Sequence, residues 1–176
     1  MEIVTTQSKH AVCLADYYTR NADRFQPWHP LVKSDHHSVS HWKRRLAERE
    51  REYQEGKSVH FIALENDRVI AACSLTNILY SPVCLCFMGY SVDREYEGSG
   101  VMMQLVRHVI NYAFENLRLN RICANYMPAN KRSGRLLEKL GFEKEGYAKR
   151  YLCINGQWED HVLTTLLNPD SSSVGP

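Results

Sequence analysis

The sequence predicts an α+β fold in which a mixed, mostly antiparallel sheet is flanked by helices. Apolar, β-branched and aromatic runs bounded by turn residues recur along the chain, which is typical of strands. Asn66-Asp67 and Asn155-Gly156 each separate two such runs and predict antiparallel hairpins. Helical spacing interrupts the strands without alternating regularly with them. This order excludes a doubly wound parallel sheet.

The elements follow one another as β-α-α-β-β-β-α-β-α-β-β. The predicted strands lie at residues 2–6, Val59–Leu64, Val69–Asn77, Cys84–Val92, Arg121–Met127, Gly146–Ile154 and Trp158–Leu167. The predicted helices lie at His10–Asn21, at 36–56, from about Gly100 to Leu117, and behind Pro128-Ala129-Asn130. Asn130 is a natural cap for the last helix, and Gly141 ends it.

The helix predicted at 36–56 combines a narrow apolar side with many charges. Trp42, Leu46 and Tyr53 mark its buried side, whereas the mixed charges of residues 43–52 predict a solvated face. His36, His37 and His41 have no carboxylate or cysteine at ligand spacing, so we expect surface histidines and no metal site.

Residues 25–30 place aromatic side chains between two prolines. Because proline restricts both its own backbone and that of the preceding residue, we expect an ordered loop rather than a helix. Ordered loops often contact ligands, and Trp28 could instead fill the core from this loop; both interpretations remain open.

Composition predicts an ordinary globular protein. The chain has 176 residues, 44% of them hydrophobic and 24% charged, with a net charge of +2. We expect one domain over residues 1–168 and a flexible tail over 169–176. No membrane-length apolar run and no secretion signal are visible, and we interpret the six cysteines as reduced core thiols, so we expect a cytoplasmic protein. The small charge gives no reason to expect direct DNA binding.

The stretch from Met88 to Glu115 organises the rest of the chain. A strand leads into Gly98-Ser99-Gly100, and a long helix with an apolar stripe follows. Glycines let the backbone pass close to a bulky anion, and the first N–H groups of a helix have no acceptor inside the helix. The turn therefore suits a phosphate or pyrophosphate, although a simple strand–turn–helix connection has the same pattern.

Two stretches carry a family resemblance. Residues 97–102, Glu-Gly-Ser-Gly-Val-Met, resemble the pyrophosphate signature of the GNAT acetyltransferases, Gln/Arg-x-x-Gly-x-Gly/Ala. Pro128-x-Asn130-x-x-Ser133, followed by Leu140-Gly141-Phe142, resembles the Rim branch, whose members acetylate N-termini of ribosomal proteins. The C-terminal run is most similar to the RimJ type, which acts on an N-terminal alanine of a small-subunit ribosomal protein.

The resemblance implies a GNAT (acyl-CoA N-acyltransferase) fold that uses acetyl-CoA as co-substrate. The backbone of Met88, Tyr90 and Val92 would pair with the pantetheine arm. The pyrophosphate would bind to backbone amides of Gly98, Ser99, Gly100, Val101 and Met102. Glu97 and Met102 depart from the signature, and we expect the Glu97 carboxylate to point to solvent, away from the diphosphate.

The resemblance also implies candidate residues for the chemistry. Ser133 would donate a hydrogen bond to the departing thiolate, and Asn130 would cap its helix and contact the pantetheine arm. Arg132 would reach the phosphates, or be a solvated helix charge. The sequence does not identify the general base. Glu145, Tyr126 and a relayed water remain candidates, and Glu145 could equally hold the turn before Gly146.

We expect the acceptor between the Phe25–Pro30 segment and the final hairpin, with Phe25, Trp28 and Tyr147 as walls and Glu159 and Asp160 near the mouth. The expected partner is the N-terminus of a ribosomal protein, presented free or on the ribosome, and oligomeric state is left open. Two alternatives stay open: an acceptor that is a small amine such as a polyamine or antibiotic, and a non-catalytic module that binds acetyl-CoA or assists ribosome assembly.

Overall fold

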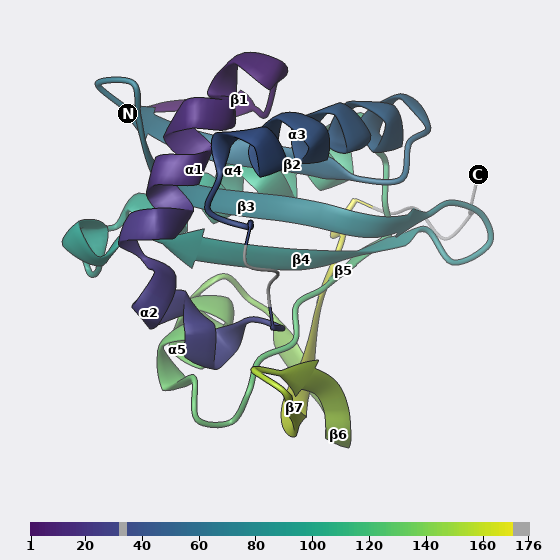
Figure 1. The fold of residues 1–176 in the computed structure, drawn as a ribbon. Coiled ribbons are helices and arrows are strands. Elements are labelled where there is room, and N and C mark those ends of the chain that lie inside the picture. Colours follow the sequence, from purple (N-terminus) through teal and green to yellow (C-terminus); the bar gives the residue numbers. More distant parts are fainter. Residues whose placement is uncertain (32–34, 171–176) are drawn as a thin grey trace.

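The computed structural model describes residues 1–31 and 35–170. They form a seven-stranded sheet in the order β1-β2-β3-β4-β5-β7-β6 (Figure 1). The strands are β1 Glu2–Thr5, β2 Val59–Glu65, β3 Arg68–Leu79, β4 Leu85–Val92, β5 Arg121–Cys123, β6 Glu143–Ile154 and β7 Gln157–Leu167. All neighbouring pairs are antiparallel except β4 and β5, which are parallel. The predicted α+β class is confirmed.

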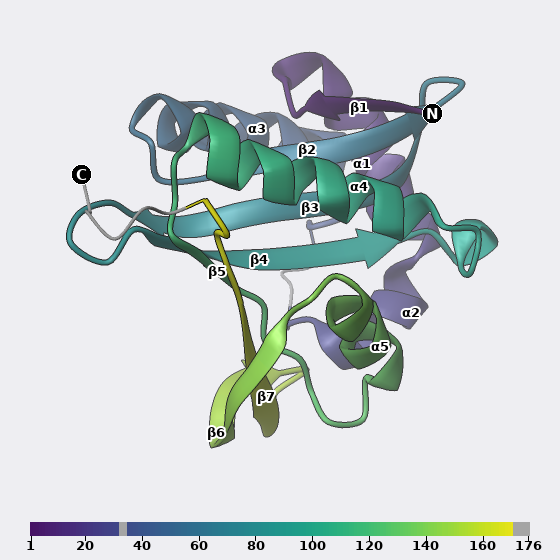
Figure 2. The same cartoon turned by 180° about the vertical axis from the view of Figure 1, so that it is seen from behind.

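Helices cover both faces of the sheet. They are α1 Ala11–Arg20, α2 Ala22–Phe25, α3 Val39–Gln54, α4 Val101–Asn111 and α5 Lys131–Lys139. Helices α1 and α3 lie on one face of β2–β4, and α4 lies on the other (Figures 1 and 2). Short 3-10 turns occupy Ser8–His10, Gln26–Trp28 and Arg94–Tyr96, and a π-helical turn, Tyr112–Asn116, follows α4.

Strand alternation divides the core into two layers. On β2, Phe61 packs in the layer under α4, whereas the next residue, Ile62, packs in the layer under α1 and α3. This is the period-2 pattern of a strand buried on both faces. Leu14 of α1 and Trp42 and Leu46 of α3 complete the second layer.

Both hairpin predictions are confirmed. Asn66 and Asp67 have φ values of 50° and 60°, and Asn155 and Gly156 have 45° and 79°. Two successive residues in the left-handed region match the twist of the flanking strands, which explains why these dipeptides set the register. The C-terminal hairpin of β6 and β7 projects from the end of the sheet (Figure 2).

The structure corrects three predicted elements. Residues 25–30 were expected to be an ordered loop rather than a helix, but Phe25 ends α2 and Gln26–Trp28 forms a 3-10 turn in which Pro27 needs no N–H acceptor. The strand predicted at 121–127 stops at Cys123, beyond which Ala124 and Tyr126 bond only to β7. Tyr53 is 47% exposed and lies outside the core.

All six cysteines are unpaired. Cys73, Cys84 and Cys86 are buried, but Cys153 is exposed, so its assignment to the core was wrong. Within residues 1–31 and 35–170 no helix is long and apolar enough to cross a membrane. The predicted tail lies outside the described residues from 171 onward.

Candidate active site

The sheet opens at its centre, where β4 and β5 separate. Their parallel pairing ends at Phe87 and Cys123, and the following residues of β5 pair with β7 instead. On its other side β4 stays paired with β3 as far as Val92. The edge of β4 from Met88 to Val92 therefore faces the gap without a neighbouring strand. An extended, amide-bearing chain fits such an edge as an added strand would.

The glycine turn follows this edge directly. Gly98 and Gly100 have φ values of +72° and +86°, a region that side chains rarely allow. A Cβ at either position would meet no atom within 4 Å, so the backbone is open to a bulky group. Helix α4 begins at Val101, and the first amides of a helix have no acceptor inside it; the amide of Val101 donates to Ser99 Oγ at 3.4 Å. These features fit a pyrophosphate, and the roles of individual amides stay predictions.

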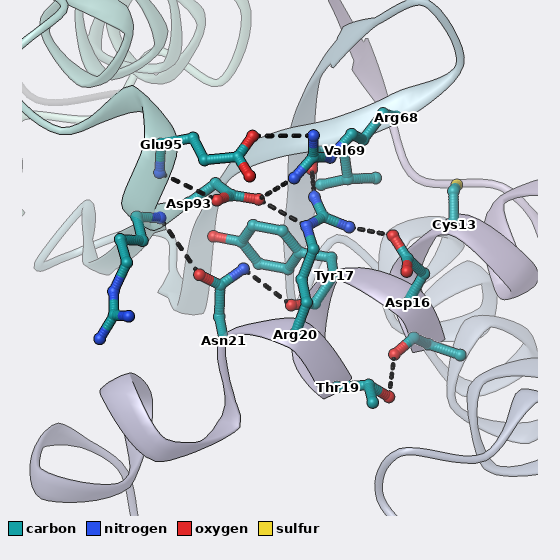
Figure 3. A network of polar contacts seen from close by, with 12 residues as sticks. Cys13, Asp16, Tyr17, Thr19, Arg20, Asn21, Arg68, Val69, Asp93 and Glu95 are labelled. Carbon is teal, nitrogen blue, oxygen red and sulfur yellow. Dashed lines mark hydrogen bonds and ion pairs between the residues drawn. The ribbon is translucent and has the colours of Figure 1, made fainter.

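A buried ion-pair network holds the far side of the turn (Figure 3). Asp93 directly follows β4, is 2% exposed, and accepts hydrogen bonds from Arg20 at 2.6 Å and Arg68 at 3.5 Å. Burial alone would raise the pKa of Asp93, but the hydrogen bonds outweigh it and hold the pKa below its usual value. The Asn21 side chain accepts from the amide of Arg94 at 3.2 Å. The end of α1 thereby anchors the segment that leads to the glycines.

Glu97 does not point freely to solvent, so that expectation was wrong. Its carboxylate forms ion pairs with Arg24 of α2 and Arg132 of α5, and its side chain is 22% exposed. Burial lowers the pKa of Arg24, and the charges of Arg132 and Arg94 lower it further. Three arginines thus surround the turn, and Glu97 neutralises part of their charge. The carboxylate that departs from the signature is held by cations.

Ser133 and Tyr90 meet across the opening of the sheet. The Tyr90 hydroxyl lies 2.6 Å from Ser133 Oγ. The side chain of Asn130 accepts from the Ser133 amide at 3.2 Å, which confirms the predicted cap and fixes Ser133 in the first turn of α5. Burial raises the pKa of Tyr90 well above its usual range, so its hydroxyl stays protonated at neutral pH.

Gly134 lets α5 approach the segment that follows β5. A Cβ at Gly134 would lie 2.9 Å from the Tyr126 ring, closer than real contacts allow. Tyr126 is fixed in turn by two backbone hydrogen bonds to Val162 of β7. The position of Ser133 therefore depends on a glycine at the next residue.

The carboxylate of Glu145 is engaged elsewhere. Its oxygens accept hydrogen bonds from Arg121 at 2.5 Å and from Thr165 Oγ1 at 2.8 Å, which ties β6 to β5 and β7. These contacts favour a structural role for Glu145 over the role of general base. Asn125 Nδ2 donates to the hydroxyl of Tyr151 at 3.2 Å.

The N-terminal segment and the final hairpin touch. The amide of Asn155 donates to the carbonyl of His29 at 2.9 Å. A cavity of about 270 Å³ beside this contact is lined by Phe25, which is otherwise buried. Trp28 and Tyr147 do not line this cavity, and the Tyr147 hydroxyl donates to Asp160 at 2.8 Å. The roles of these three walls stay predictions.

A second cavity, of about 200 Å³, lies against β2–β4 on the face that α1 and α3 cover, and we call it the α3 cavity. Gly89 and Ser91 of β4 form its floor beside the sheet opening. Arg49 and His60 line it farther from β4. Arg49 lies in the charged run that predicted a solvated face, so that prediction was wrong at this position. No Asp or Glu among the described residues lines this cavity.

The described residues contain no group of three His, Cys, Asp or Glu side chains placed to hold a metal ion. Sequence reasoning found the glycine turn, Asn130 and Ser133, but it assigned Tyr90 only through its backbone. The sequence around Tyr90 does not indicate a role for its hydroxyl, because the hydroxyl contacts Ser133, which is far away in the chain.

Comparison with known proteins agrees with this geometry. Residues 3–143 match the model of the acetyltransferase (GNAT) domain family. The chain is 42% identical to the [Ribosomal protein uS5]-alanine N-acetyltransferase of Escherichia coli (strain K12) over 159 residues, 89% of this chain and 82% of that one. It is 38% identical to the probable N-acetyltransferase YjcK of Bacillus subtilis (strain 168), over 86% and 85% of the two chains.

A solved structure is similar over almost the whole chain. The ribosomal-protein-S5-alanine acetyltransferase of Vibrio fischeri superposes with a TM-score of 0.93 at 36% identity, covering 97% of this chain and 94% of that one. The open sheet and the glycine turn thus define an acyl-CoA-binding transferase. The chain belongs to the GNAT acetyltransferase family, and acetyl-CoA is its co-substrate.

Proposed function

We propose that this enzyme transfers the acetyl group of acetyl-CoA to the α-amino group of an N-terminal alanine, on a small-subunit ribosomal protein. The opening between β4 and β5 carries the proposal, because the unpaired stretch of β4 leads along the chain to the glycine turn and its residues Gly89 and Ser91 line the α3 cavity. The uS5-alanine and S5-alanine acetyltransferases among the similar proteins support this acceptor. We further propose that residues 1–168 act as one catalytic domain.

In this proposal acetyl-CoA lies along the β4 edge, with its pyrophosphate on the amides of residues 98–102 and Arg132 close by. The amine attacks the thioester directly, since no covalent intermediate is required. An α-amine has a pKa of about 8, so a sizeable fraction is already neutral near pH 7.5 and a strong base is unnecessary. This supports a mechanism without Glu145 and with a relayed water as proton acceptor.

The leaving thiolate needs a hydrogen bond, which we assign to Ser133. The protonated Tyr90 hydroxyl can donate to Ser133 Oγ, and the Ser133 proton is then free to point at the sulfur. Asn130 orients the first turn of α5 for this contact. Tyr90 acts on the thioester only through Ser133, so it is a positioning residue.

A polyamine acceptor fits the site less well. A polycation is recognised by carboxylates, whereas the α3 cavity is lined by Arg49 and by no described carboxylate. The alternative of a non-catalytic module that binds acetyl-CoA is decided by whether acetyl transfer is measured.

The test is acetyl transfer to a short peptide that begins with alanine, beside the same peptide with a blocked α-amine and beside spermidine. We expect acetylation of the free peptide alone. Transfer to spermidine alone would contradict the N-terminal acceptor. Binding of acetyl-CoA without transfer to any of these acceptors would contradict the proposed reaction on peptides.

A further inference from the structure

The α3 cavity contains a guanidinium that no described carboxylate pairs with. Arg49 Nε is buried and has no hydrogen-bond acceptor in the described part of the chain. The guanidinium carbon lies 5.1 Å from the centroid of the Trp42 ring, and Trp42 stacks on Tyr18 at 4.7 Å between centroids. A cation on an aromatic face is held in place without losing its charge. The stack therefore fixes a positive charge at the cavity wall.

His60 adds a second unpaired group to the same wall. It is 8% exposed, and its Nε2 is buried without a hydrogen-bond partner among the described residues. Burial, with the charges of Arg49 and Arg45, lowers the pKa of His60 to about 2, so the ring is neutral at pH 7. The carboxylate of Glu52 is 3.8 Å from Nε2 and bonds instead to Ser58 at 2.7 Å.

The Arg49 side chain bonds to the Tyr18 side chain, but its Nε has no partner among the described residues. Buried polar atoms of folded proteins nearly always have partners, so Arg49 Nε and His60 Nε2, two unpaired atoms of residues that line one cavity, suggest a ligand. The charge on Arg49 restricts the chemistry of that ligand to an anion or a strong acceptor. Guanidinium binds carboxylate through parallel N–H bonds, and a neutral histidine can donate a further hydrogen bond.

The position of the wall relates this ligand to the reaction centre. The cavity floor reaches β4 at Gly89 and Ser91, whereas His60 belongs to β2, two strands away. Neighbouring strands are about 4.8 Å apart, so the wall lies roughly 10 Å from β4. An extended chain advances about 3.3 Å per residue. An acceptor whose amine reaches the β4 edge would bring residues two to four positions behind it over the cavity.

We propose that the α3 cavity selects acceptor chains that carry a carboxylate close behind the N-terminal residue, and that Arg49 binds this carboxylate with His60 as a second contact. The inference rests on the proposed function and extends it from the amine to the residues that follow. Arg49 is a specificity residue, distant from the reacting atoms.

The test uses alanine-initiated peptides that differ at one position among the third to fifth residues, with Glu, Gln or Lys there. We expect kcat/KM for the Glu peptide to exceed that for the Gln peptide by roughly tenfold, the typical value of one charge-assisted hydrogen bond. The Lys peptide should be poorer still. In Arg49→Gln the preference should vanish, mainly through KM, and Arg49→Lys should keep part of it.

Arg51→Gln is the matched control, because Arg51 also belongs to α3 but is exposed and lines neither cavity. It should keep the wild-type preference. Equal kcat/KM for the Glu and Gln peptides in the wild type would overturn the inference and leave the proposed function intact. A preference that persists in a folded Arg49→Gln would also overturn it.

Calorimetry with N-acetylated product peptides separates the two proposals, since it needs no turnover. Tighter binding of the Glu product than the Gln product, lost in Arg49→Gln, supports the cavity assignment even if the enzyme acetylates no peptide. Equal binding of both products, with turnover intact, refutes the cavity assignment alone.

Discussion

The hydroxyl groups of Tyr90 and Ser133 lie 2.6 Å apart, one at the open edge of β4 and the other in the first turn of α5. This contact joins the two elements that border the gap in the sheet. It places a serine proton beside the path that we propose for the thioester.

Ser133→Ala should lower kcat by roughly 10- to 100-fold, because one hydrogen bond to a charged group contributes about 1.5–3 kcal/mol. The KM for acetyl-CoA should rise much less, since the bond strengthens only as the thiolate forms. Steady-state kinetics with acetyl-CoA and an alanine peptide measures both constants. A rise in KM with unchanged kcat would move Ser133 from chemistry to binding.

Tyr90→Phe should lower kcat by a smaller factor, and its effect should disappear in the Ser133→Ala background. Tyr90 has no hydroxyl to orient once Ser133 is gone, so the double-mutant cycle should be strongly non-additive. Independent effects of the two substitutions would show that Tyr90 acts without Ser133.

Glu97→Gln should lower the KM for acetyl-CoA by up to about fivefold, since ion pairs near the protein surface contribute at most about 1 kcal/mol. Removing the carboxylate frees Arg24 and Arg132 for the phosphates. The KM of the variant should also depend more steeply on ionic strength. Glu95→Gln is the control, because Glu95 pairs with Arg68 instead. A higher KM in Glu97→Gln would show that Glu97 positions the turn.

Gly134→Ala should destabilise the fold by about 1–3 kcal/mol, the usual cost of overpacking. The new Cβ would lie 2.9 Å from the Tyr126 ring, and relief of this clash would move α5 together with Ser133. Denaturant unfolding gives the free energy, and kcat should fall as well. Glu138→Ala, on an exposed position of α5, should change neither quantity appreciably.

The Asp93 network should make stability fall in acid. The pKa of Asp93 is lower in the folded than in the unfolded chain, so between the two values the unfolded state binds more protons. The stabilisation is complete above the unfolded value near 3.8 and is lost as the pH falls through the folded value. Asp93→Asn should cost about 3 kcal/mol at pH 7, typical of breaking a buried pair.

Unfolding at pH 7 and at successively lower pH, for wild type and Asp93→Asn, tests this point. The difference between the two proteins should shrink as the pH falls below 3.8. A constant difference would mean that Asp93 stabilises the fold by shape alone.

The features that the sequence predicted correctly are those with local causes. The turn dipeptides at Asn66 and Asn155 and the cap at Asn130 act over a few residues, so the local sequence is enough to predict them. The glycine turn is equally local. Each could be placed without knowledge of the packing.

The features that sequence reasoning missed depend on tertiary packing. Arg49 sits among charges of both signs, and only the folded chain shows which of them turns toward the sheet. Glu97 forms ion pairs with Arg24 of α2 and with Arg132 of α5, both far from it in the sequence. Tyr90 meets Ser133 only because β4 and β5 part.

The hydrogen bond between Asn155 and His29 has a consequence for biosynthesis. A ribosome delivers the chain from its N-terminus, so His29 is exposed long before Asn155 has been made. The wall of the acceptor side closes only after the C-terminal hairpin has emerged and folded back. A nascent or C-terminally truncated chain therefore lacks this contact, and an acceptor site built beside it, as we expect, would be complete only once the hairpin has been made.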